Sequence, residues 1–288
     1  MISVFSHIEK CAGTSLTTKF RNELPFQSCD IVSKSNVVSK SELIQTKTLF
    51  PRLKIMSGHN LSSNAFDDIA SVFGDIQVFT VVRDPVERLV SNYLHDKTRG
   101  VWLGTLQEYQ NIPWKKNYLS RFIGGGDVET ARSNLSRISY IITVRNLEPL
   151  APLIFEKFGL RLSAVIPRQN THESNKSAIP DDLSASNGVT IGKHQIAEDL
   201  HSEILENNAI DIDLFQVLRE NELNQFGMTQ LPSKQYVRSA IPRKLATIPA
   251  LVYRNSIQKP LILGRTGYTA LPRNATSPDK TTEIHAFK

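Results

Sequence analysis

The chain has 288 residues, with 34 lysines and arginines against 28 aspartates and glutamates, and 40% of its residues are hydrophobic. This ordinary globular composition predicts one α/β core with an appended segment, and the positive excess alone does not separate nucleic acid, phosphate cofactors and acidic glycans as ligands. The sequence lacks the roughly 20 consecutive apolar residues of a membrane helix, and its two cysteines exclude a disulfide framework. We therefore expect a soluble cytoplasmic protein, and we leave peripheral contact with a membrane open.

The positive charge is concentrated at the carboxyl end of the chain. Residues 223–288 contain ten basic and two acidic side chains, so this segment carries +8, and residues 1–222 carry the remaining −2 of the total of +6. We expect residues 1–222 to form the folded domain and residues 223–288 to form a basic, proline-containing extension. Because aromatic residues are not interleaved with the basic ones, the extension does not resemble a nucleic-acid-binding module.

Strands and helices are predicted to alternate along the domain. Runs rich in β-branched residues predict strands over residues 2–7, 54–57, 76–82, 140–144 and 162–166. Helical spacing predicts helices over residues 13–24, 86–97, 152–158, 195–207 and 212–219. This alternation favours a three-layer α/β fold with a central parallel sheet. The polar stretch 167–192 is predicted to be a long loop.

The first predicted strand and helix are joined by a loop suited to an anion. Its sequence from residue 7 to residue 16 is His-Ile-Glu-Lys-Cys-Ala-Gly-Thr-Ser-Leu. A helix N-terminus presents unpaired N–H groups, Gly13 allows the backbone to approach a ligand, and Lys10 adds a positive charge. Thr14 and Ser15 add hydroxyl donors. The alternative is a helix cap with an incidental lysine.

A second loop follows the strand predicted over residues 76–82. It reads Arg-Asp-Pro-Val-Glu-Arg-Leu-Val-Ser from Arg83 to Ser91, with the proline in the first turn of the next helix. Arg83 at the carboxyl end of a strand can present a planar guanidinium to a phosphate, and Ser91 lies two turns into the helix. The alternative is a set of surface ion pairs, which contribute little to stability.

Together the two loops resemble those of carbohydrate sulfotransferases such as heparan sulfate 2-O-sulfotransferase, which use 3′-phosphoadenosine 5′-phosphosulfate (PAPS). The first loop departs from the family pattern at Glu9, in place of proline, and at Cys11, in place of threonine, whereas the second loop matches Arg-Asp-Pro-x-x-Arg-x-x-Ser at every fixed position. The resemblance implies a P-loop nucleotide-hydrolase-like fold. It implies that the 5′-phosphosulfate is bound by Lys10, Cys11, Ala12, Gly13, Thr14 and Ser15, and the 3′-phosphate by Arg83 and Ser91.

A histidine between the two loops is the predicted catalytic base. His59 follows Gly58 at the end of a predicted strand, where ligands bind in open α/β folds. An imidazole can take a proton from a sugar hydroxyl, and the resemblance implies this role. A capping or core histidine is the alternative. We expect His7 only to orient its loop and His95 to be solvent-facing or packed, and the resemblance implies that Lys176 lies over the adenosine.

The resemblance implies in-line transfer of a sulfuryl group from PAPS to a hydroxyl of a polysaccharide, oligosaccharide or glycolipid. Lys10 is expected to neutralise charge on the leaving oxygen and His59 to remove the proton, without a metal ion. Two other functions stay open, a non-catalytic protein that binds a nucleotide or polyanion and an ATP-dependent phosphotransferase. The phosphotransferase is disfavoured because no Gly-Lys-Ser/Thr closes the first loop. The sequence does not indicate an oligomeric state.

Overall fold

The computed structural model describes residues 1–31, 38–167, 183, 188–192 and 194–232. Its centre is a five-stranded sheet in the order β2-β3-β1-β4-β5, and every pair of neighbouring strands is parallel. The strands are β1 (Ile2–Ser6), β2 (Ser28–Asp30), β3 (Ile55–Gly58), β4 (Ile76–Val82) and β5 (Tyr140–Thr143).

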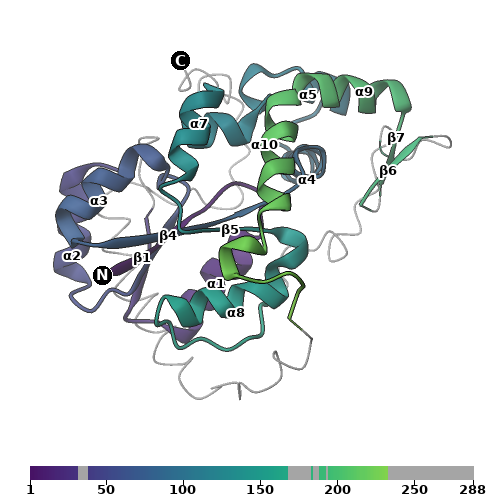
Figure 1. Cartoon of the computed structure of the whole chain (residues 1–288). Coiled ribbons are helices and arrows are strands. Elements are labelled where there is room, and N and C mark those ends of the chain that lie inside the picture. Colours follow the sequence, from purple (N-terminus) through teal and green to yellow (C-terminus); the bar gives the residue numbers. More distant parts are fainter. Residues whose placement is uncertain (32–37, 168–182, 184–187, 193, 233–288) are drawn as a thin grey trace.

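Helices cover both faces of this sheet. Helices α1 and α8 lie on one face, and α3, α4 and α10 lie on the other (Figure 1). This arrangement is the predicted three-layer α/β fold. The helices are α1 (Gly13–Glu23), α2 (Lys40–Leu49), α3 (Phe66–Phe73), α4 (Pro85–Thr98), α5 (Leu106–Gln110), α6 (Tyr118–Gly124), α7 (Val128–Leu135), α8 (Leu147–Lys157), α9 (Glu198–Asn207) and α10 (Ala209–Glu220).

The central strands explain why the sequence predicts this part of the fold well. All five residues of β1 are buried, and the last five residues of β4 are buried as well. Strands that are covered on both faces are mostly apolar, and three of the five residues of β1 and five of the seven residues of β4 are apolar, so both strands can be recognised in the sequence. Helix α4 begins as predicted, because Pro85 is its first residue and the Asp84 side chain accepts hydrogen bonds from Val86 N and Glu87 N.

The strand order decides where the two loops meet. Strand β1 lies between β3 and β4, so the segments that follow these three strands leave the same carboxyl edge of the sheet side by side. The chain moves from β1 towards β2 and from β3 towards β4, in opposite directions across the sheet. A change of direction of this kind opens a crevice at the carboxyl ends of the strands, where α/β folds bind ligands.

The strand predicted over residues 162–166 is wrong. This segment is irregular, and no further strand pairs with the free edge of β5 in the described part of the chain. Side chains occupy that edge: Gln225 binds the N–H and C=O of Ile141, and Glu222 accepts from Thr143 N. Because these backbone groups already have partners, another strand cannot add here. Gln225 thus packs on the core although it belongs to the predicted extension.

The irregular segment is nevertheless held in place by a buried lysine. Lys19 of α1 is 1% exposed, and its Nζ donates to Ser163 Oγ at 2.6 Å and to Val165 O at 2.7 Å. Glu23, one turn further along α1, accepts from the same Nζ at 2.6 Å. Lys19 therefore fixes the residues that lead to Ile166.

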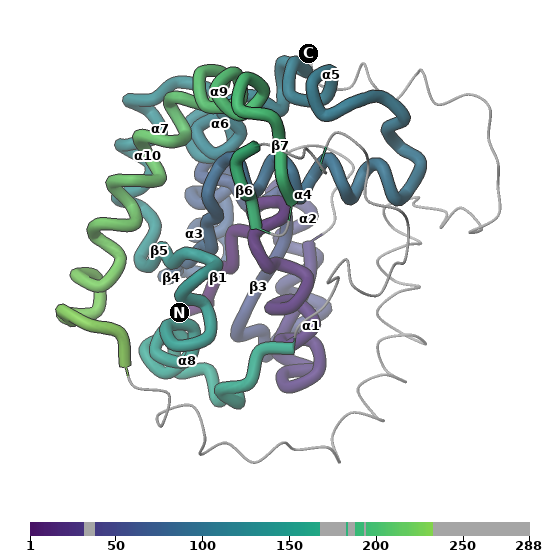
Figure 2. Tube along the Cα trace, turned by 90° about the vertical axis from the view of Figure 1, so that its right-hand side faces the viewer, coloured from purple at the N-terminus to yellow at the C-terminus, as the bar shows by residue number. Residues whose placement is uncertain are grey.

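A second, smaller core lies beside α4. Apolar residues of α4 pack against α5, α9 and a two-stranded hairpin of β6 (Val189–Ile191) and β7 (His194–Ile196), which lies next to α4 (Figure 2). The helix predicted over residues 195–207 begins only at Glu198, because its first residues belong to β7. No described helix is both long and apolar enough to cross a lipid bilayer.

A buried aspartate joins α10 to α6 and gives the first prediction. Asp211 is 0% exposed and accepts hydrogen bonds from Leu119 N at 2.6 Å and Ser120 N at 2.8 Å. Asp211→Ala leaves both N–H groups buried without acceptors, so we expect a loss of about 2–4 kcal/mol in the free energy of unfolding, measured by urea denaturation. Asp213→Ala changes an exposed residue of the same helix and should have little effect. Equal effects of the two changes would contradict this role of Asp211.

Candidate functional site

A cavity of about 730 Å³ lies at the carboxyl edge of the sheet. It is formed by the segments that follow β1, β3, β4 and β5 and by one side of α4. Eight of the predicted site residues line it: Lys10, Ala12, Gly13, Thr14, Ser15, His59, Arg83 and Ser91.

The loop after β1 has an unusual backbone. Lys10 and Ala12 adopt positive φ angles of 63° and 60°, and Asn117 is the only other described residue besides glycine that does so. A left-handed conformation is unfavourable for a residue with a Cβ, and such strain is concentrated at functional sites. The loop leads into the N-terminus of α1, whose first N–H groups can bind an anion.

Gly13 makes room for a neighbouring imidazole. A Cβ at this position would lie 1.5 Å from Nε2 of His7. The ring of His7 therefore occupies the space over the first residue of α1, and only glycine is compatible with it there. This contact fixes the position of the His7 side chain relative to the start of α1.

His59 is held in place by His7. Its ring stacks on that of His7 with the centroids 3.8 Å apart, and His59 Nδ1 lies 2.8 Å from the backbone O of His7. Because a carbonyl oxygen only accepts hydrogen bonds, Nδ1 must be the donor, and neutral His59 then keeps the lone pair on Nε2. Burial, followed by the charges of His59, Arg21 and Lys10, lowers the pKa of His7 to about 3, so His7 is neutral at physiological pH.

Arg83 is connected to a second arginine through a carboxylate. Glu87 accepts from Arg83 Nε at 3.2 Å and from Arg145 Nη2 at 2.8 Å. Burial raises the pKa of Glu87, but the hydrogen bond from Arg145 and the charge of Arg83 outweigh it and keep the pKa below its usual value. Two guanidinium groups therefore share one carboxylate at the cavity that Ser91 also lines.

One side of α4 faces the cavity beyond Ser91. His95 follows Ser91 by one turn and Arg99 by two turns, and Arg99 Nη1 lies 3.3 Å from His95 Nε2. Burial, the charge of Lys10 and that of Arg99 lower the pKa of His95. Burial also lowers the pKa of Lys10, although the charge of Asp96 opposes this. Lys10 therefore lies close to this part of α4.

Two predicted site residues are not brought into the cavity. Cys11 is 1% exposed in the core, its N–H donates to Ile8 O at 3.3 Å, and its Sγ donates to Glu9 O at 3.5 Å. Burial raises the pKa of the Cys11 thiol to about 12, so the thiol stays protonated. Lys176 lies outside the described residues.

Other cavity residues were not singled out from the sequence. Arg145 follows β5 as Arg83 follows β4, and this shared position at a strand end was a usable signal. His95 lines the cavity, whereas we expected it to be solvent-facing or packed. Asp96 of α4 and Lys115 of the short helix η2 (Pro113–Lys115) also line it, and their pairing across 19 residues left no signal in the sequence. No group of three or more His, Cys, Asp or Glu side chains suited to a metal ion occurs among the described residues.

Comparisons with known proteins give one family-model match, which covers part of the chain that lines this cavity. The model of the sulfotransferase family matches residues 3–127, which include both loops, His59 and α4. Among solved structures, the chain is similar to a sulfotransferase from Alicyclobacillus acidocaldarius, with 12% sequence identity, a TM-score of 0.46, and coverage of 79% of this chain and 99% of that chain. A search of curated protein sequences finds no match.

The contact between Gly13 and His7 gives the second prediction. Gly13→Ala forces the imidazole of His7 out of its place, which disturbs the stack with His59 and the start of α1. Because a bound anion stabilises the folded state, inorganic pyrophosphate should raise the melting temperature of the unchanged protein, and this shift should be lost in the variant. An equal shift in both proteins would contradict the assigned contact.

Proposed function

We propose that this chain, whose residues 3–127 match the sulfotransferase family, transfers a sulfuryl group from PAPS to a hydroxyl of a carbohydrate. The observation that carries the proposal is the shared cavity: Lys10, His59 and Arg83 come from three adjacent strand ends and line one space. PAPS is the usual co-substrate of the family. The acceptor, the mechanism and the assignment of each residue are parts of the proposal.

The donor binds along the two loops in this proposal. The start of α1, with Gly13 and Thr14, receives the 5′-phosphosulfate, because N–H groups at a helix N-terminus bind anions. Arg83 and Ser91 bind the 3′-phosphate, and Arg145 strengthens this end of the site through its shared contact with Glu87. Arg145 is an addition to the residues expected from the sequence.

The reaction is an in-line displacement at sulfur. His59 Nε2 removes the proton of the acceptor hydroxyl as its oxygen forms the new bond to sulfur. The bond from sulfur to the 5′-phosphate oxygen breaks, and adenosine 3′,5′-bisphosphate leaves with the negative charge that Lys10 and the start of α1 stabilise. The hydrogen bond from His59 Nδ1 to His7 O supports this role, because it leaves Nε2 free to accept a proton.

The two other functions left open by the sequence are less well supported. A protein that only binds a nucleotide or polyanion needs no base, yet His59 lies in the cavity with its tautomer fixed. An ATP-dependent phosphotransferase would carry Gly-Lys-Ser/Thr at the start of α1, where this chain has Gly-Thr-Ser. The cytoplasmic location remains a prediction from the sequence.

The identity of the donor can be tested by calorimetric titration. We expect adenosine 3′,5′-bisphosphate to bind more tightly than adenosine 5′-monophosphate, and Arg83→Gln to weaken the bisphosphate by about 10- to 100-fold through loss of charged hydrogen bonds to the 3′-phosphate. Arg132→Gln is the matched control, because Arg132 is exposed and pairs with Glu129 away from the cavity. Equal binding of the two nucleotides would refute the proposed donor.

The two catalytic assignments are tested by separate substitutions and the rate of sulfuryl transfer from labelled PAPS. We expect His59→Ala to lower kcat by about 10²- to 10⁴-fold, because a general base is lost. Lys10→Ala should lower kcat by about 10²- to 10³-fold, because charge on the leaving oxygen is no longer neutralised. His201→Ala and Lys40→Ala lie outside the cavity and serve as controls. A variant at His59 or Lys10 that keeps the unchanged rate would rule out the role of that residue.

A further inference from the structure

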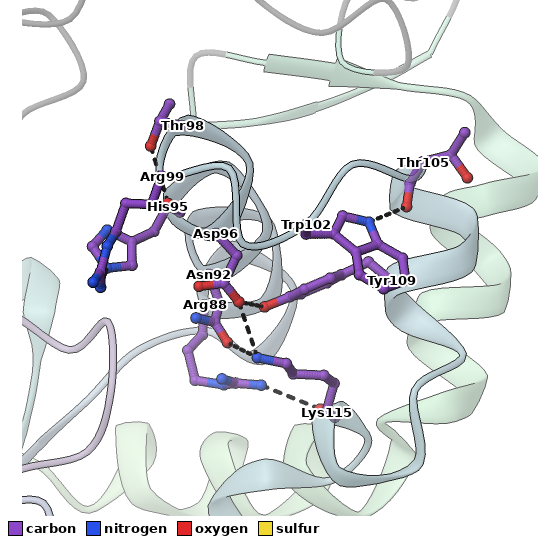
Figure 3. A network of polar contacts seen from close by, with 10 residues as sticks. All are labelled: Arg88, Asn92, His95, Asp96, Thr98, Arg99, Trp102, Thr105, Tyr109 and Lys115. Carbon is purple, nitrogen blue, oxygen red and sulfur yellow. Dashed lines mark hydrogen bonds and ion pairs between the residues drawn. The ribbon is translucent and has the colours of Figure 1, made fainter. Parts of the chain in front are cut away.

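Asp96 of α4 is held in one position by residues of α5 and η2. Tyr109 OH donates to Asp96 Oδ2 at 2.5 Å, and Lys115 Nζ donates to the same oxygen at 3.3 Å (Figure 3). Lys115 Nζ also donates to Asn92 Oδ1 at 2.9 Å, and Arg88 Nη2 donates to the backbone O of Lys115 at 3.3 Å, which keeps η2 beside α4. The carboxylate of Asp96 therefore has a fixed place at the cavity that it lines.

Lys10 lies among other positively charged side chains of the same cavity. Burial lowers the pKa of Lys10, and the charges of Arg83 and Arg99 lower it further. Lys10 forms no ion pair with any residue that the structure describes, so the charges around it act through space. An ammonium group that is partly buried beside two guanidinium groups loses its proton more readily than a free lysine. A negative charge is therefore needed here if Lys10 is to stay charged.

Two carboxylates supply this negative charge. Asp96 raises the pKa of Lys10 more than any other charge does, and Glu9 comes next. Asp96 Oδ1 accepts no hydrogen bond from a described residue, so this oxygen is not taken up by the network on Oδ2. An imidazole is either neutral or positive, so no histidine can replace these carboxylates. The histidines that line the cavity with Lys10 are His7, His59 and His95.

We propose that Asp96 is a positioning residue for the reaction: its carboxylate offsets the cations around Lys10, so that the ammonium group keeps its charge for the leaving oxygen. A direct ion pair would occupy the ammonium group and compete with the donor. Tyr109 and Lys115 prevent this pairing, because they hold the carboxylate through Oδ2. The role rests on the proposed function, in which Lys10 acts on the leaving oxygen.

The charge of Lys10 can be measured without any turnover. Acetic anhydride acetylates only the uncharged amine, so mass spectrometry of Lys10 acetylation at rising pH reports its protonation. We expect Asp96→Asn to raise the rate about three- to tenfold near about pH 8, because loss of the negative charge lowers the pKa of Lys10. Arg99→Gln removes an exposed positive charge and should lower the rate about twofold, since exposed charges are screened. Asp213→Asn, at an exposed position of α10, is the control.

The same change should appear in the pH dependence of sulfuryl transfer from PAPS. Because the reaction needs Lys10 in its charged form, kcat falls as the pH rises through the pKa of Lys10. Asp96→Asn lowers that pKa, so the fall in kcat should move to lower pH. Asp96→Glu keeps the negative charge and should restore much of the original profile.

Shifts of opposite sign separate this role from a purely structural one. Loss of packing alone would not make Asp96→Asn speed acetylation and Arg99→Gln slow it, and Arg99→Gln still tests the balance of charges if Asp96→Asn fails to fold. An acetylation rate at Lys10 that Asp96→Asn leaves unchanged would overturn the role of Asp96, and so would an unchanged rate in Arg99→Gln. Opposite shifts in acetylation without any transfer from PAPS would instead overturn the proposed function.

Discussion

The imidazole of His7 occupies the space that a side chain at position 13 would fill, and the part of the cavity that contains His59 is arranged around that contact. His7 touches the first residue of α1 on one side and the ring of His59 on the other. Its backbone oxygen also fixes the hydrogen bond of His59 Nδ1. His7 thus sets the positions of the loop before α1 and of His59, the proposed base, relative to each other. A neutral ring suits this place, because a positive charge here would oppose protonation of His59.

Acidic side chains of helix α4 hold the positively charged side chains around the cavity. At the N-terminal end of α4, Glu87 shares its carboxylate between Arg83 and Arg145. Further along the helix, Asp96 and Lys115 form a nearly balanced pair. Partial burial makes such charges costly unless they have partners, and partners also hold long side chains in one place. Helix α4 therefore presents charged side chains to the cavity that partners of opposite charge hold in place.

The sequence was informative where local rules decide the structure. Strands β1 and β4 are rich in apolar and β-branched residues because both faces of the sheet are covered, and Asp84 with Pro85 indicates the start of α4. The strand predicted over residues 162–166 failed because tertiary contacts decide this segment: Lys19 binds its backbone, and side chains occupy the edge of β5. Neither contact can be read from the local pattern.

The same distinction applies to the site. The eight predicted residues that line the cavity lie in the loops after three adjacent strands, in the first turn of α1 or on α4. Motif and topology together were therefore sufficient to predict them. Cys11 shows the limit of a motif, because its side chain faces the core and the cavity loses no hydroxyl donor at that position. Lys115 shows the limit in the other direction, since only the packing of η2 against α4 brings it to Asp96. Cavity residues that belong to short motifs could thus be predicted from the sequence, whereas those brought in by contacts between distant segments could not.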